Sequence, residues 1–134
     1  MLYKKITEYG SISFDKAIVA KIVRNIVSAH EKRVFFSDAK GRLHRNLMKE
    51  MSEDTSFLEA NYREEDNTLD LCLYFILRFG TSIRGTAEVL TEAIRRDIPS
   101  IIGCRVDRVD IVITGVLSRK LLKNRTEVTT YADK

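Results

Sequence analysis

The chain has 134 residues, 44% of them hydrophobic and 31% charged, which is ordinary for one globular domain with its own core. The longest apolar run, residues 71–77, is far shorter than the roughly 20 residues of a membrane-spanning helix. No apolar segment follows the N-terminal Met-Leu-Tyr-Lys-Lys, so we expect no secretory signal. Cys72 and Cys104 form no C-x-x-C pair and lie in apolar surroundings, which is typical of buried free thiols in a reducing cytosol.

The net charge is +4, and its distribution is uneven. Residues 116–134 hold five basic and two acidic side chains, which leaves about +1 for the rest of the chain. Within that remainder, residues 30–50 are basic on balance and residues 53–70 are acidic. This pattern is either an ordinary solvated surface of mixed charge or a sign that neighbouring copies meet basic side to acidic side.

A first helix is predicted over residues 14–30, after an edge extension at 1–9 and a short strand at 10–13. Ser13 is a good N-cap, and Asp15 suits the positive end of the helix dipole. The apolar residues of this helix recur at amphipathic spacing. They are Ile18, Ile22 and Ile26, with Val19, Val23 and Val27 beside them. We therefore expect one side of the helix to dock on a sheet.

The next segment allows more than one interpretation. Val34-Phe35-Phe36 is either a short strand or a hydrophobic plug, and Gly41 interrupts the pattern. A short helix is then predicted up to about Ser52, because apolar residues recur at helical spacing. These residues are Leu43, Leu47, Met48 and Met51. This helix either caps the core or presents an apolar face to a partner, and periodicity alone does not separate the two.

The clearest pattern in the chain lies in residues 69–79. Apolar side chains occupy every second position, which places them on one face of an extended strand. They are Leu69, Leu71, Leu73, Phe75, Leu77 and Phe79. We expect helices to cover this face of a central strand. A strand at 57–63 precedes it, and the polar residues 64–67 predict a hairpin turn between the two.

A second helix is predicted over residues 83–97, with Ser82 as its cap and Pro99 just beyond its end. Its apolar stripe consists of Ile83, Ala87, Leu90, Ile94 and Ile98. Gly103 then leads into a last strand at 105–115, in which Val109, Ile111 and Ile113 alternate with more polar residues.

These elements predict an α+β fold. The order is strand, helix, insert, strand, strand, helix, strand, and the two main helices pack on one face of a small mixed sheet as a two-layer sandwich. We assign residues 1–116 to a single domain, with the insert at about 31–56. Residues 117–134 form a basic C-terminal tail, in which Leu117, Leu121 and Leu122 allow a short helix and 124–134 are expected to be loose.

Residue chemistry indicates no catalytic centre. His30 and His44 lie on different elements and outside metal-ligand spacing, so we expect no metal. Cys72 and Cys104 have no motif around them that would activate a nucleophile. The pair Glu64-Glu65 lies in a turn that is expected to face water, where a carboxyl pKa is not raised.

A nucleotide site is not indicated either. Residues 80–85 follow a strand and open a helix, where an anion could bind. They lack the spacing of a dinucleotide-binding or phosphate-binding loop. A capped turn at Thr81 and Ser82 is therefore the preferred interpretation, and no cofactor is expected.

Three blocks of the sequence together resemble the alkaline shock protein family, also called the cell-envelope stress response family. The blocks are Tyr9-Gly10-Ser11-Ile12-Ser13 before an Ile- and Val-rich helix, the alternating strand at 71–79 with its Gly80-x-Ser82-Ile83 turn, and Gly103-x-x-Val106-x-x-Val109-x-Ile111-x-Ile113-x-Gly115-Val116. The resemblance implies a bacterial cytoplasmic protein that serves envelope homeostasis. It also implies no enzymatic activity, self-association, and attachment to the membrane through an anchoring partner.

The expected function is therefore a non-enzymatic cytoplasmic scaffold that forms homo-oligomers and binds a membrane-anchored protein. The candidate contact residues are the apolar cluster of Val34, Phe35 and Phe36 and the basic residues Lys120, Lys123 and Arg125. The alternative is a small KH-like RNA-binding protein that contacts phosphates through its basic insert and tail. The order of helices and strands favours that alternative, whereas the missing G-x-x-G clamp and the nearly neutral body oppose it.

Overall fold

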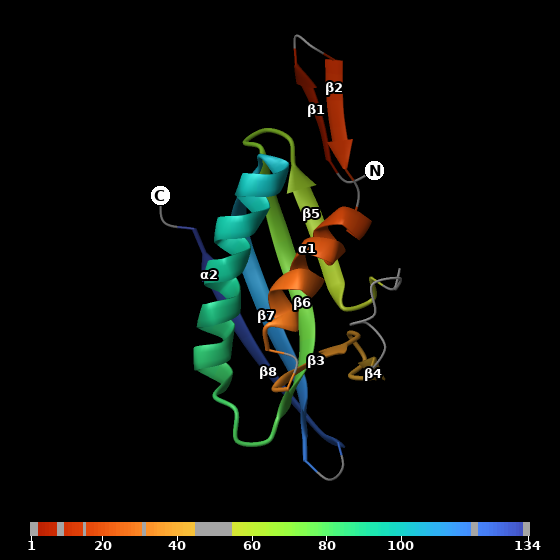
Figure 1. The fold of residues 1–134 in the computed structure, drawn as a ribbon, viewed down its shortest axis with the longest axis vertical. Coiled ribbons are helices and arrows are strands. Elements are labelled where there is room, and N and C mark those ends of the chain that lie inside the picture. The colour runs from red at the N-terminus through yellow and green to blue at the C-terminus, as the bar shows by residue number, and fades with distance from the viewer. Residues whose placement is uncertain are drawn as a thin grey trace.

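The computed structural model describes residues 3–7, 10–14, 16–30, 32–44, 55–118 and 121–132. In chain order the elements are β1 (Tyr3–Thr7), β2 (Gly10–Phe14), α1 (Lys16–Ser28), β3 (Val34–Ser37), β4 (Leu43–His44), β5 (Leu58–Arg63), β6 (Thr68–Arg78), α2 (Ile83–Ile102), β7 (Arg105–Leu117) and β8 (Leu121–Tyr131). Both helices lie on the same face of one large sheet (Figure 1). The predicted α+β sandwich is confirmed.

The large sheet is built around β6. β5 pairs antiparallel with the first part of one edge of β6, and β3 pairs antiparallel with the last part of the same edge. The other edge of β6 pairs parallel with β7, which in turn pairs antiparallel with β8. β4 adds a short pairing to β3. The sheet is therefore mixed, and α2 is the crossover that a parallel β6–β7 pair requires.

The core lies between the helices and the predicted apolar face of β6. The side chains of Leu69, Leu71, Leu73, Phe75 and Leu77 are all 2% exposed or less, as the alternation predicts. They pack in one cluster with the buried faces of α1 and α2. The expectation fails only for Phe79, whose side chain is 70% exposed. β6 ends at Arg78, and the chain turns through Gly80 at φ +88° before the alternation would reach Phe79.

The second face of the sheet is also partly buried. Tyr74, Ile76 and Val112 point away from the helices in the strand alternation, yet all three are buried. One end of this face lies close to the connection between β3 and β4, where Gly41 approaches Thr114 so closely that a Cβ added to Gly41 would lie 3.7 Å from the Thr114 Cβ. The face that the sequence marks as mixed in character is therefore not a plain solvated face.

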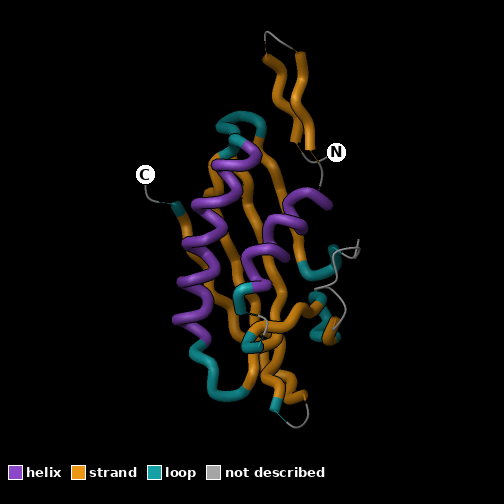
Figure 2. The backbone as a smooth tube through the Cα atoms, in the orientation of Figure 1, coloured by secondary structure: helices purple, strands orange, loops and turns teal. Residues whose placement is uncertain are grey.

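The beginning of the chain differs from the prediction. The expected strand at 10–13 exists as β2, but it pairs with β1 in a separate two-stranded sheet (Figure 2). Ser13 lies inside β2, opposite Lys4, and is not the cap of α1. Asp15 lies outside the described residues. Propensity identifies a strand here correctly, but the partner of a strand is not a local property.

Both helices differ from prediction at one detail. Ile18 is 41% exposed, because the buried stripe of α1 centres on Val19 and Val23, and Ile18 lies about 100° away around the helix axis. α2 continues past Pro99 to Ile102, so Pro99 is inside the helix and not beyond it. Gly103 ends α2 in the left-handed conformation, and its N–H donates to the Pro99 carbonyl at 2.9 Å.

The insert and the tail hold two further corrections. Leu43 belongs to β4 and not to the predicted short helix, whereas Leu47, Met48, Met51 and Ser52 lie outside the described residues. In its described part the tail is neither a short helix nor loose, because residues 121–131 form β8, which pairs with β7 from Arg108 to Leu117. β8 begins with two leucines and continues mostly with polar and charged residues, so its sequence lacks the apolar period that indicates a strand. The strand is instead stabilised by its backbone pairing with β7.

Candidate partner-binding surface

A cavity of about 640 Å³ opens at the end of the sheet where α1 ends and α2 begins. It is lined by His30, Arg33, Val34, Arg78, Phe79, Gly80, Thr81, Ser82, Gly85, Thr86 and Val89. These residues come from the α1–β3 connection, the end of β6, the β6–α2 turn and the first turns of α2. The cavity thus joins segments that lie about 50 residues apart in the chain.

The β6–α2 turn forms one wall of this cavity. The Thr81 N–H donates to the Arg78 carbonyl at 3.1 Å, and the Ser82 Oγ accepts from the Gly85 N–H at 3.0 Å. Gly85 fits closely here, since a Cβ at this position would lie 3.1 Å from the Ser82 Oγ. The predicted cap at Ser82 is confirmed. The Ser82 hydroxyl oxygen therefore accepts a hydrogen bond within the turn, as in an ordinary N-cap.

Arg78 fastens the end of β6 to the α1–β3 connection. Its Nε donates to the Lys32 carbonyl at 2.6 Å, and its guanidinium lies 5.9 Å from the centre of the Phe35 ring. The guanidinium of Arg33, by contrast, has no hydrogen-bond or ion-pair partner among the described residues. None of the described residues that line the cavity is acidic, and the positive end of α2 points toward it. The described lining therefore carries positively charged side chains without a carboxylate among them.

Two large apolar side chains lie at the same place. Phe79 is 70% exposed and Val89 is 49% exposed, and both line the cavity. Exposure of these apolar side chains to water is unfavourable, and a partner that covered them would remove this free-energy cost. The combination of free positive charge and uncovered apolar side chains is typical of a surface that binds another protein.

The predicted apolar contact residues, Val34, Phe35 and Phe36, lie on β3 and point to its two opposite faces. Val34 and Phe36 face the helices and are 1% exposed, so they are core residues. The Phe36 ring packs against Phe57 and Phe75 at centroid distances of 4.5 and 5.8 Å. Phe35 points to the other face and is half-buried near Arg78. The core interpretation therefore holds for Val34 and Phe36, and only Phe35 stays available as a contact residue.

Two of the predicted basic contact residues, Lys123 and Arg125, belong to β8. Arg125 donates from Nε to the Glu127 Oε1 at 3.3 Å and from Nη1 to the Ala39 carbonyl at 3.3 Å. Its charge is thus partly used within the fold. Lys120 and the side chain of Lys123 lie outside the described part of the chain.

The opposite end of the sheet carries an ion-pair network that sequence reasoning did not identify. Arg63 donates from Nη2 to the Asp107 Oδ2 at 2.6 Å and lies 3.6 Å from the Asp70 Oδ1. The hydrogen bond from Arg63 lowers the pKa of the Asp107 carboxyl, while desolvation acts against that shift. No local signal indicates this pairing, because Arg63 and Asp107 are 44 positions apart.

The remaining reactive groups are held in forms of low reactivity. Desolvation by burial raises the pKa of the Cys72 thiol and of the Cys104 thiol, which disfavours the nucleophilic thiolate. Cys104 is buried as predicted, whereas Cys72 is only partly buried. The Tyr74 hydroxyl donates to the Glu59 Oε2 at 2.9 Å, and desolvation by burial raises the pKa of Tyr74.

In the described ranges, no three His, Cys, Asp or Glu side chains gather in a group that could hold a metal ion. In the same ranges neither helix combines the length and the apolar character that crossing a bilayer requires.

Comparison with known proteins places the chain in a family. No curated protein and no solved structure matches the chain. The model of the alkaline shock protein family, described as having a cell envelope-related function, matches residues 4–118. This range includes α1, α2 and all strands except β8 and the first residue of β1. The chain therefore belongs to the alkaline shock protein family, and its function is related to the cell envelope.

Proposed function

We propose that this protein is a non-enzymatic cytoplasmic scaffold of the cell envelope, which works by self-association and by binding a membrane-anchored protein. Family membership over residues 4–118 supports the link to the envelope. The scaffold role, the cytoplasmic location and the two kinds of partner are the parts that we add to it.

The observation that carries this proposal is the cavity beside α2. Phe79 and Val89 remain exposed there next to the unpaired guanidinium of Arg33, which has no partner among the described residues. A folded domain that keeps apolar side chains at a positively charged opening is suited to bind a protein surface that is both apolar and acidic. Conversion of a small molecule would need convergent polar groups with perturbed pKa values, and the shifts at Cys72 and Cys104 run toward the unreactive thiol.

Self-association is tested by sedimentation velocity over a protein concentration series. We expect the weight-average sedimentation coefficient to rise with concentration and to fall again when salt is added, because charge contacts are screened. A chain that remains monomeric at the highest concentration would contradict the self-association.

The membrane-anchored partner is tested by flotation. The protein is mixed with inverted membrane vesicles from a bacterium that contains it, with the same vesicles after protease treatment, and with protein-free vesicles of the same lipids. We expect it to float only with the untreated vesicles, since the proposed attachment is to a protein. Equal flotation with protein-free lipid, or none with any vesicle, would contradict this part of the proposal.

The RNA-binding alternative loses one of its basic contact residues to an ion pair within the fold. Arg125 belongs to the basic tail on which that alternative relies, and it is paired with Glu127. Filter retention of a labelled single-stranded RNA at low salt distinguishes the two functions. Retention that is lost as salt increases would favour the RNA-binding function over the scaffold.

A further inference from the structure

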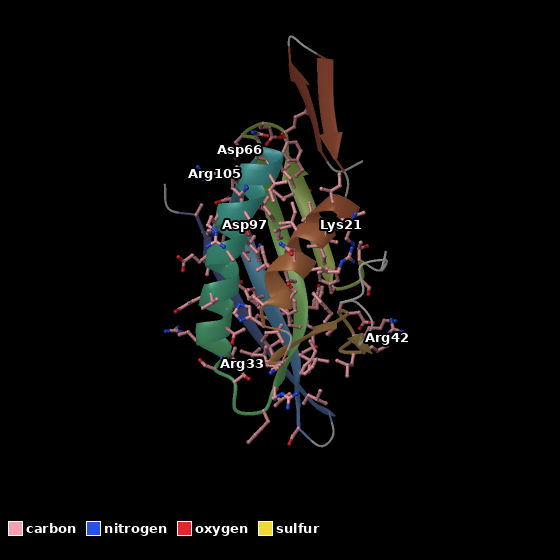
Figure 3. The ribbon with its side chains drawn as sticks, in the orientation of Figure 1. Lys21, Arg33, Arg42, Asp66, Asp97 and Arg105 are labelled. Carbon is pink, nitrogen blue, oxygen red and sulfur yellow. The ribbon has the colours of Figure 1, made fainter. Side chains whose placement is uncertain are left out.

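Side chains of opposite charge, unpaired among the described residues, lie at the two ends of the large sheet. The β6–α2 turn, which lines the cavity, lies at the lower end of this sheet in Figure 1, and the turn between β5 and β6 lies at its upper end. Figure 3 shows Arg33 near the first end and Asp66 near the second. Because the two surfaces face in opposite directions, a single copy cannot bring them together.

The basic end is wider than the cavity described above. A second cavity, of about 430 Å³, adjoins it and is lined by Ser28, Ala29, His30, Lys32 and Arg33. The two cavities share His30 and Arg33, and neither has an acidic residue among its described lining residues. Lys32 and Arg33 are exposed, and neither side chain has an ion-pair partner among the residues that the structure describes.

The acidic end is a firm turn in which two of the three carboxylates are unpaired among the described residues. Glu64 and Glu65 are exposed, and neither has a hydrogen-bond or ion-pair partner in the described ranges. The nearby Arg63 pairs with Asp107 at 2.6 Å and with Asp66 of the turn at 3.8 Å, so no ion pair joins it to Glu64 or Glu65 among the described residues. Asn67 fixes the turn, because its side chain accepts from the Tyr62 hydroxyl at 2.7 Å and its carbonyl accepts from the Arg105 N–H at 3.2 Å.

Each end also presents apolar surface. Ile101 lies in the last turn of α2, and its side chain is 64% exposed. This end of α2 is close to the β5–β6 turn, since the Asn67 side-chain amide donates a hydrogen bond to the Gly103 carbonyl at 3.3 Å. Phe79 and Val89 are the exposed apolar residues of the basic end. Each end thus combines uncovered apolar side chains with free charge of one sign, and the two signs are opposite.

We propose that the acidic β5–β6 turn of one copy binds in the basic cavity of the next copy, with Ile101 covering the apolar side chains there. This inference rests on the proposed self-association and names its surfaces. The occupant is a second copy, because this chain itself carries the surface of complementary charge. The contact joins two different surfaces at opposite ends, so it repeats and builds a chain of subunits instead of a closed dimer.

Two charge-reversed variants test the contact. One is Glu64→Lys with Glu65→Lys, and the other is Lys32→Glu with Arg33→Glu. In either variant alone, the β5–β6 turn of one copy and the cavity of the next carry charges of the same sign. We therefore expect self-association of that variant to weaken about 100-fold. An equimolar mixture is expected to assemble again, because the intact ends still fit and the reversed ends again carry opposite signs. Sedimentation velocity measures all three samples.

Controls reverse the same number of charges elsewhere. Glu88→Lys with Glu92→Lys matches the first variant, and Lys16→Glu with Lys21→Glu matches the second. None of these four residues lines either of the two cavities described above or belongs to the turn. Circular dichroism checks that every variant is folded, and recovery in the mixture is itself evidence that both partners are.

The outcomes separate the two proposals. If the wild type assembles and the charge-reversed variants assemble equally well, the end-to-end contact is wrong while the scaffold function stands. If each variant is impaired but the mixture does not recover, the acidic turn and the basic cavity do not bind each other, and the cavity accepts another acidic protein. If the wild type does not assemble at all, self-association is wrong as well.

Discussion

Replacing Arg95 by methionine should destabilise the fold far more than its half-exposed position on α2 suggests. Arg95 reaches from α2 to the irregular start of β7, where the register with β6 shifts after Val106. Its Nη1 donates to the Val106 carbonyl at 2.6 Å, and its Nη2 donates to the Asp107 carbonyl at 2.8 Å. A third contact, at 3.2 Å, reaches the Thr130 Oγ1 on β8. One side chain therefore fastens α2 to two strands.

The expected magnitude follows from these bonds. A hydrogen bond to a charged group contributes about 1.5–3 kcal/mol, and bonds that share a guanidinium are not additive. Because the group is partly exposed, water would replace some of what is lost, and we expect Arg95→Met to lower the free energy of unfolding by about 3 kcal/mol. For a domain of this size that corresponds to a fall in Tm of about 12 °C.

The neighbouring arginine is a matched control. Arg96 is exposed and pairs with Asp97 at 3.0 Å, a surface ion pair that contributes about 0.5 kcal/mol or less. Urea unfolding followed by circular dichroism, at a protein concentration where the chain is monomeric, measures both variants. If Arg95→Met and Arg96→Met lose the same stability, the argument that Arg95 fastens α2 to β7 is refuted.

Three further predictions concern the core, pH and capping. Leu73→Ala should lower the free energy of unfolding by about 2–5 kcal/mol, since Leu73 is fully buried, whereas Phe79→Ala should lower it by less than about 1 kcal/mol. Urea unfolding measures both variants, and equal losses of stability would contradict the assigned end of β6. Arg63 lowers the pKa of Asp107, so the pair adds stability above the unfolded pKa and loses it as pH falls through the folded pKa. Unfolding below about pH 4 should therefore be steeper in the wild type than in Arg63→Met, and identical pH profiles would argue against the pair. Ser82→Ala should cost about 1 kcal/mol and Ser82→Gly only a few tenths, and thermal unfolding that ranks them the other way would exclude the cap.

Several features of the fold follow from local sequence alone. The alternation from Leu69 to Leu77 predicts a strand with one buried face, and those side chains are the centre of the core. The spacing of Ala87, Leu90 and Ile94 likewise predicts the buried stripe of α2. Such predictions succeed because a period of 2 or 3.6 residues is set by the backbone and repeats within one element.

The candidate binding surface is predictable only in part. Sequence reasoning identifies the notable residues of the β6–α2 turn, but their neighbours Arg33 and His30 come from a segment about 50 positions earlier. The same reasoning offers Val34 and Phe36 as contact residues, although register with β6 places Phe36 opposite Phe75 in the core. An apolar triplet has the same sequence whether it faces a helix or a partner, so strand pairing decides its role.

By itself the sequence determined the class of the fold, the two helix faces and the central strand, because these depend on contacts between residues a few positions apart. Only the tertiary structure decided that residues 121–131 pair with β7, that β1 and β2 form their own sheet, and that Arg95 completes the start of β7. It also decided that Arg33 lies near one end of the large sheet and Asp66 near the other. The physical reason is that strand pairing and charge placement join residues distant in the chain, which no local period encodes.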